Sequence, residues 1–384
     1  MSTNTVLIKL AHEAIAEAIG KYPDESLQLI AAKCRALIAG YTARWANRAL
    51  YTPLEIERTT TVPLVNPATD RVSRTFFLAG KIDIVGEYNG RRVLIDHKST
   101  SQDIATPDGP FWKQLTVEGQ VSHYMLLKWL KGEKIDYAVW DVMRKPQTAP
   151  KKVTKAEMKA VASLGEYCDR KVTIANPTQW DGRETLEMYE ARLARDCTKE
   201  RPDHYFQRRT IPRLDKHLID YAHDVWQHGQ DVLHTRNTVA KTGREPPMNS
   251  GACMLYGSPC KFLGVCSGCD NVDSDKWRRK TWVHNELPEV NGSDGKDLLT
   301  NSRIRCFQTC RRKHYYEYEL GIERIDEEER EALLFGTIWH QALSAWWSVF
   351  LPSEERFNER SESNGCPDNE AGNPDRSSET TVVS

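Results

Sequence analysis

Two aspartates interrupt apolar runs in the stretch FFLAGKIDIVGEYNGRRVLIDHKST, residues 76–100: Asp83 in the first run and Asp96 in the second. Lys98 follows two residues after Asp96. Burying a carboxylate among such apolar neighbours costs several kcal/mol unless a partner compensates for the lost hydration. A buried ion pair or an exposed strand face would explain the pattern, and so would a bound divalent metal ion. The spacing of Asp83 and Asp-x-Lys favours the metal site.

The stretch has the composition of a β-hairpin that turns at Asn89-Gly90. In-register pairing around this turn places residues whose numbers sum to about 179 opposite each other, so Asp83 and Asp96 become cross-strand neighbours. Residues two apart on a strand share a face, which places Lys98 on the same side as Asp96. The hairpin therefore gathers two carboxylates and one ammonium on one patch.

Apolar periodicity predicts the elements that position this patch. Two helices are expected in 5–48, a strand in 54–64, a helix in 113–132, a further strand in 134–145, and mostly helix in 154–244. The order helix, three strands, helix, strand predicts an α/β sandwich and not a doubly wound sheet. Gln120 and Tyr124 lie one turn apart on the helix after the hairpin, and therefore on one face.

Composition excludes several classes of protein. The chain has 384 residues and a net charge of −1, so no overall basic excess indicates nucleic acid, and DNA contacts would depend on local patches such as 143–159. No apolar run reaches the roughly 18 residues of a membrane span. The N-terminal stretch is an amphipathic helix with acidic residues and not a signal peptide. We expect a cytoplasmic protein without a membrane partner.

Four of the ten cysteines lie in the short stretch CMLYGSPCKFLGVCSGC: Cys253, Cys260, Cys266 and Cys269. Disulfides are uncommon in cytoplasmic proteins, so a metal is the better explanation for this grouping. Taken alone, four closely spaced thiols suggest a zinc site.

Three ordered motifs, AGKIDIVG, LIDHKS and GQVSHY, resemble those of the PD-(D/E)xK nucleases of the RecB type. That family has the pattern G-x-x-D, D/E-x-K and Q-x-x-x-Y on an α-β-β-β-α-β sandwich. The matching residues here are Gly80, Asp83, Asp96, His97, Lys98, Gln120 and Tyr124.

The resemblance implies a site for Mg²⁺ or Mn²⁺ held by Asp83, Asp96 and the backbone carbonyl of His97. Hard oxygen ligands suit these ions, whose remaining waters supply a nucleophile. Lys98 would orient and help to deprotonate that water and would counter charge in the transition state. The glutamine and tyrosine of the third motif would position the strand. The implied reaction is phosphodiester hydrolysis.

A subset of RecB-type nucleases carries a 4Fe–4S cluster held by three cysteines after the core and one before it. CMLYGSPCKFLGVC resembles the later trio, which implies Cys253, Cys260 and Cys266 as ligands. NSRIRCFQTCRRKHYYEYELGI resembles the segment that holds the distant fourth cysteine, here Cys310. Cys269 becomes the spare cysteine in this interpretation, although it could substitute locally for Cys310.

The stretch LLFGTIWHQALSAWW resembles the family's G-T-x-x-H helix, which implies His340 as a further metal ligand. The chain departs from the family in two ways: Arg311 replaces a proline, and this segment comes last where family members place it first. Either the chain is permuted and the segment completes its own core, or it is a slice through tandem nuclease units. The sequence leaves both histories open.

The expected organisation follows from these motifs. It comprises a nuclease core (1–150), a helical region (151–250), a cysteine loop (251–271), a linker (272–300), a helical segment (301–350) and a disordered tail (351–384). The implied function is a metal-dependent DNA nuclease, an exonuclease of phage or bacterial replication, recombination or repair, which would work beside a separate helicase or recombination protein. The alternatives are a catalytically weak DNA-binding remnant of a tandem gene and a zinc-bound scaffold without enzymatic activity.

Overall fold

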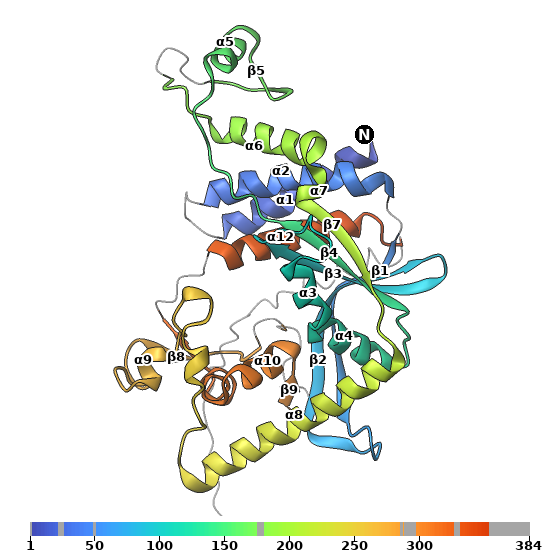
Figure 1. The fold of residues 1–384 in the computed structure, drawn as a ribbon, viewed down its shortest axis with the longest axis vertical. Helices are drawn as coiled ribbons and strands as arrows, with labels where there is room; N and C mark the ends of the chain where they lie inside the picture. The colour runs from blue at the N-terminus through green and yellow to red at the C-terminus, as the bar shows by residue number, and fades with distance from the viewer. Residues whose placement is uncertain are drawn as a thin grey trace, which may run out of the picture.

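A six-stranded mixed sheet forms the centre of the protein (Figure 1). The computed structural model describes residues 2–21, 27–48, 51–174, 180–284, 287, 297–325 and 331–352. The strands of the sheet are β1 (Thr52–Val65), β2 (Val72–Tyr88), β3 (Arg91–Thr100), β4 (Tyr137–Arg144), β7 (Phe206–Ile211) and β9 (Asp297–Leu299). Their order is β1-β2-β3-β4-β7, and the short β9 pairs in parallel with the start of β2.

The β2–β3 hairpin has the register expected from the sequence. Its pairs run from Tyr88↔Arg91 to Ile84↔Ile95. Asn89 and Gly90 both have positive φ, as the type I′ turns of two-residue hairpins require.

Helices cover both faces of the sheet because the strands alternate their apolar side chains between them. Val93 and Ile95 of β3 join the core on one face, and Leu94 joins the core on the other. The first face carries α1 (Thr3–Gly20), α2 (Leu27–Trp45), α6 (Leu186–Arg195) and α12 (Glu331–Ser348). The second carries α3 (Pro110–Thr116), α4 (Gly119–Leu130), α8 (Asp215–Thr242) and α10 (Asn301–Thr309). The predicted α/β sandwich is confirmed.

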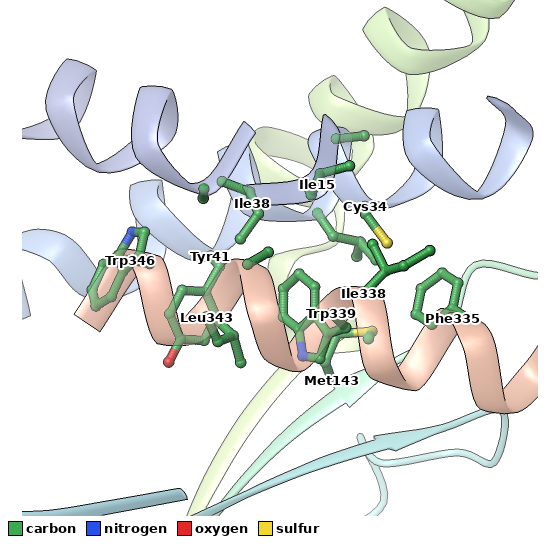
Figure 2. Packing of buried hydrophobic residues seen from close by; sticks show 14 of the residues in the cluster. Ile15, Cys34, Ile38, Tyr41, Met143, Phe335, Ile338, Trp339, Leu343 and Trp346 are labelled. Carbon is green, nitrogen blue, oxygen red and sulfur yellow. The ribbon is translucent and has the colours of Figure 1, made fainter. Parts of the chain in front are cut away.

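Helix α12 lies in the first of these cores although it comes last in the described chain. Figure 2 shows its side chains facing residues of α1 and α2, with Trp339 and Trp346 inserted against Tyr41. The indole nitrogens of Trp346 and Trp347 donate hydrogen bonds to Thr42 Oγ1 (3.0 Å) and Tyr41 Oη (3.2 Å). The C-terminal segment therefore folds back onto its own chain.

The structure differs from the sequence prediction in several local elements. The helix expected over 113–132 is two helices, because the chain turns at Val117 and Glu118 between α3 and α4. The region expected to be mostly helical also contains β7, which pairs with β4 and closes one edge of the sheet. Its other elements are α5 (Lys155–Leu164), β5 (Glu166–Tyr167), β6 (Arg170–Lys171) and α7 (Pro202–Tyr205). The predicted disordered tail lies, from residue 353 onwards, outside the described residues.

The cysteine loop packs against the segment that follows it. This part contains α9 (Leu263–Cys266), β8 (Trp277–Arg279), α11 (Arg311–His314) and β10 (Ile322–Arg324). Phe262, Trp277, Tyr316 and Ile322 form its small core, and β8 pairs with β10. None of the helices in the described part of the chain has the length and apolar character needed to cross a bilayer.

Candidate active site

The candidate site lies where β2 and β3 separate. Their pairing ends at Ile84↔Ile95, after which β2 continues along β1 and β3 continues along β4. Two residues after Ile95, the amide of His97 donates to Asp83 Oδ2 at 2.7 Å. The Asp83 carboxylate thus takes the place of a ladder partner and holds the fork between the two strands.

Three potential metal ligands converge beside this fork. One ligand atom each from Glu57, Asp83 and His340 lies within 4.8 Å of the other two. Among the described residues, this is the group of three or more potential ligand atoms that lie so close together. His340 Nδ1 is 3.8 Å from Asp83 Oδ1 and 3.9 Å from Glu57 Oε1. The three residues come from β1, β2 and α12, so this site depends on the packing of α12 against the core.

Glu57 reaches the site through a distortion of β1. The neighbouring pairs are Ile56↔Ile84 and Arg58↔Ile82, so Glu57 lies across from Asp83. Its φ of 51° is in the left-handed region, which costs a residue with a Cβ roughly 1–3 kcal/mol. Glu57 also forms an ion pair with Lys81 Nζ at 3.1 Å.

A second polar chain lies beside the three ligands. Lys98 Nζ is 2.7 Å from Asp96 Oδ2, donates to Gln120 Oε1 at 2.6 Å, and lies over the ring of Trp140 at 5.0 Å. Gln120 Nε2 in turn donates to Tyr124 Oη at 2.9 Å. The side-chain amide of α4 therefore fixes the position of the ammonium on β3.

Tyr124 fits against the sheet because its neighbour on β2 has no side chain. A Cβ added at Gly80 would lie 2.8 Å from Tyr124 Cε1, which is closer than such atoms approach. The glycine of the G-x-x-D motif therefore lets α4 pack closely enough to bring Gln120 to Lys98.

Asp96 is buried without the partners that a buried carboxylate needs. It has no exposed surface, and neither oxygen makes a hydrogen bond within the described structure. The approach of Lys98 to Oδ2 is an ion pair whose direction is poor for a hydrogen bond, and Oδ1 has no polar partner there. An orphaned oxygen beside further carboxylates is what a site for a hard cation provides, so the donor set fits Mg²⁺ or Mn²⁺.

The pKa values show the cost of crowding these groups. Burial raises the pKa of Asp83 to about 6; His340 opposes the rise, and Asp96 and Glu57 add to it. Burial acts against protonation of His340, but Asp83 and then Glu57 raise its pKa to about 8. Burial also acts against ionisation of Glu57, yet His340 and Lys81 hold its pKa below the usual range. Negative charge at this site therefore calls for a cation.

A groove of about 1020 Å³ leads to the site between α1 and α12. Its lining includes lysine, hydroxyl and metal-ligand side chains: Glu57, Lys81, Ser99, Lys145, Thr337 and His340. An anionic chain could follow the lysines and hydroxyl groups to the potential ligands.

On the opposite face of the sheet, Asp141 of β4 is a second buried carboxylate, and polar side chains surround it. The side chain of His97 points away from Asp96, and its Nδ1 is 3.3 Å from Asp141 Oδ2. Asp141 also accepts from Tyr41 Oη (2.5 Å) and from an Arg208 guanidinium nitrogen (3.1 Å). Although burial acts the other way, Arg208 and His97 hold the pKa of Asp141 well below its usual range. The backbone amide of His97 faces the fork, and the imidazole packs beside α12, with its ring centroid 6.1 Å from that of His340.

The cysteines singled out from the sequence lie in the cysteine loop, except Cys310, which follows α10. Burial raises the pKa of the Cys266 thiol to about 11; Arg312 opposes this, and Cys260, Cys310 and Cys253 add to the rise. Cys269 is exposed. No three of the cysteine sulfur atoms lie within 4.8 Å of one another in the described residues.

The structure brings together most of the residues singled out from the sequence. Asp83 and His340 meet, and Asp96, Lys98, Gln120 and Tyr124 form one chain. The imidazole of His97 lies on the face of β3 opposite Asp96, where it contacts Asp141 and His340. Glu57 was missed, because β1 contains no motif and Glu57, two residues after Glu55, resembles any exposed strand residue.

Comparison with known families agrees with this geometry. The family model for the PD-(D/E)XK nuclease superfamily matches residues 4–266 and 299–375. Searches of the curated proteins and of the solved structures found no match. The two matched segments make up most of the chain and include each strand and helix that contributes to the site. The chain belongs to the PD-(D/E)XK nuclease superfamily.

Proposed function

We propose that this protein is a divalent-metal-dependent DNA nuclease whose active site lies in the fork between β2 and β3. The observation that supports this most strongly is the buried, unsatisfied Asp96 carboxylate, which lies 2.7 Å from Lys98 and beside the ligand group of Asp83 and His340. The groove of about 1020 Å³ leads to these residues.

In this proposal Asp83, Asp96, His340 and the His97 carbonyl hold Mg²⁺ or Mn²⁺. Such an ion, when bound, lowers the pKa of water and neutralises phosphate charge. Lys98 orients the attacking water by donating to it and counters the negative charge of the transition state, with Gln120 holding the ammonium in place. Burial raises the pKa of Tyr124 well above its usual range, so its hydroxyl stays protonated and can serve as a donor.

DNA cleavage with and without metal tests the proposal. Wild-type protein should degrade linear DNA in Mg²⁺ or Mn²⁺ and be inactive in EDTA, and Asp83→Asn should be inactive in both. Cleavage by Asp83→Asn at the wild-type rate would remove Asp83 from the mechanism, and no cleavage by the wild type in either metal would overturn the nuclease assignment.

We further propose exonucleolytic action, which the resemblance to RecB-type enzymes supports. The expected result is digestion of linear duplex or single-stranded DNA, with covalently closed circles of the same sequence left intact. Nicking of closed circles at a comparable rate would contradict it.

We also propose that Cys253, Cys260, Cys266 and Cys310 hold a 4Fe–4S cluster. Three of these thiols add to the pKa shift of the fourth, and the backbone amide of Asn249 donates to Cys310 Sγ at 3.4 Å, a contact of the kind that tunes such clusters. The fold-back of α10 and α12 onto the core supports a chain that completes its own nuclease unit, as a permuted gene would encode.

Iron and sulfide analysis of anaerobically purified protein tests this ligand set. Cys310→Ser should lose the brown colour, and the matched variant Cys269→Ser should keep it. One zinc per chain without iron would exclude the cluster, and colour loss only in Cys269→Ser would exclude Cys310 as a ligand.

A further inference from the structure

We infer that Glu57 of β1 is itself a metal ligand, completing a carboxylate, carboxylate and imidazole set with Asp83 and His340. This inference rests on the proposed function and extends it to a residue outside the three nuclease motifs and the histidine helix. The ligand would be a hard divalent ion, Mn²⁺ or Mg²⁺, since two of the three donors are carboxylates.

The first observation is the meeting of three different elements at one point. Ligand atoms of Glu57, Asp83 and His340 lie within 4.8 Å of one another, and each residue is only partly exposed. Glu57 lies directly across β1–β2 from Asp83, between the pairs Ile56↔Ile84 and Arg58↔Ile82. Its carboxylate thus shares the side of the fork that α12 covers with His340.

The second observation is independent of Glu57. Asp96 is fully buried, its Oδ1 has no polar partner among the described residues, and its charge acts on both Asp83 and His340. An unsatisfied carboxylate whose charge acts on two members of the group shows that protein contacts alone do not balance the site. A cation shared by these residues would supply the missing partner.

The backbone of Glu57 is consistent with this role. Its φ of 51° is unusual for a residue inside a long strand, and the distortion aims the side chain at His340 and Asp83. The carboxylate now contacts Lys81 Nζ at 3.1 Å. Lys81 would compete with a bound ion for the carboxylate oxygens of Glu57. Substitution of Glu57 should therefore weaken metal binding, whereas substitution of Lys81 should not.

Mn²⁺ titration followed by electron paramagnetic resonance, with no DNA present, tests the inference. Glu57→Gln should weaken Mn²⁺ binding by at least about ten-fold. Lys81→Met, which removes the competing ammonium, should bind Mn²⁺ as tightly as the wild type or more tightly. Thermal unfolding in EDTA checks that each variant is folded. Should Glu57→Gln not fold, Glu57→Gly offers a second test, because glycine tolerates this φ while still lacking the ligand.

The outcomes separate this inference from the proposed function. Wild-type affinity for Mn²⁺ in both folded Glu57 variants would overturn the assignment of Glu57 as a ligand. DNA cleavage by the wild-type protein would still leave the nuclease proposal standing. Parallel weakening in Glu57→Gln and Lys81→Met would show that the ion pair supports the fold, and would also overturn the assignment of Glu57. A wild-type protein that neither binds Mn²⁺ nor cleaves DNA would overturn both.

Discussion

Two buried carboxylates lie on opposite faces of the same pair of strands and meet opposite surroundings. Asp141 on β4 is contacted by Tyr41, Arg208 and His97. Asp96 on β3 has a single ion pair, with Lys98, and no hydrogen bond within the described residues. Asp141 therefore has the environment of a structural ion pair, and Asp96 has the environment of a residue that awaits a ligand.

The comparison shows why burial of charge does not identify a functional site by itself. Breaking a buried pair costs the protein stability, whereas an orphaned carboxylate already costs stability and persists only where something else requires it. The Asp141 carboxylate, which protein groups satisfy, holds the fold together, and the unsatisfied Asp96 carboxylate belongs to the chemistry that we propose.

Lys98→Met should produce the largest change on the Asp96 face. Loss of a cation that orients the water and stabilises charge in the transition state lowers turnover by about 10²–10³-fold, and Mn²⁺ binding should persist because Lys98 is not a proposed ligand. Steady-state cleavage of linear DNA and Mn²⁺ titration measure the two effects. The same substitution at the exposed Lys113 is the control. Equal loss of metal binding and cleavage in Lys98→Met would contradict the role.

Arg208→Met should produce the largest change on the Asp141 face. It leaves Asp141 buried without its cation, which should lower the free energy of unfolding by about 3–5 kcal/mol. Urea unfolding in EDTA measures this. Adding Asp141→Asn to Arg208→Met should recover part of the loss, since the uncompensated charge is then gone. No destabilisation in the single variant would break the contrast between the two faces.

The pH dependence of stability should have opposite signs at Asp83, beside Asp96, and at Asp141 in metal-free protein. The pKa of Asp83 is raised to about 6, so its stabilising contribution is present below pH 3.8 and is lost as the pH rises through 6. The pKa of Asp141 is lowered, so its contribution is present above pH 3.8 and is lost as the pH falls. Urea unfolding across pH measures both effects on the free energy of unfolding. Asp83→Asn should reduce the loss of stability as the pH rises through 6, and Asp141→Asn should reduce the loss as the pH falls below 3.8. Identical profiles for the two variants would contradict this.

Gln120→Ala and Tyr124→Phe should give the smallest effects. Gln120 holds Lys98 through one hydrogen bond, and Tyr124 contacts Gln120 through another. Each bond contributes about 1 kcal/mol, so turnover should fall by roughly five- to ten-fold, with the larger loss for Gln120→Ala. Cleavage assays at saturating metal measure this. A loss as large as that of Lys98→Met would mean that Gln120 contacts substrate or metal directly.

The sequence predicted the parts of the site that depend on residues close together in the chain. The Asn89-Gly90 turn predicts the observed pairing of Ile84 with Ile95, and helical spacing places Gln120 and Tyr124 on one face. The position of β7 depends on pairing with β4 more than 60 residues earlier, which six residues of mixed character do not reveal. The positions of Glu57 and of the side chains around Asp141 likewise depend on contacts between distant segments. The periodicity of the sequence does not predict such contacts.

Asp96→Asn tests the central claim, that this carboxylate is buried for a metal ion and not for the fold. The account predicts that the variant is at least as stable as the wild type in EDTA, because Asn removes a buried charge that has one ion pair, with Lys98, and no hydrogen bond within the described structure. It also predicts no DNA cleavage in Mg²⁺ or Mn²⁺ and no increase in thermal stability when Mn²⁺ is added. Cleavage at the wild-type rate, or a loss of stability in EDTA as large as that of Arg208→Met, would contradict it.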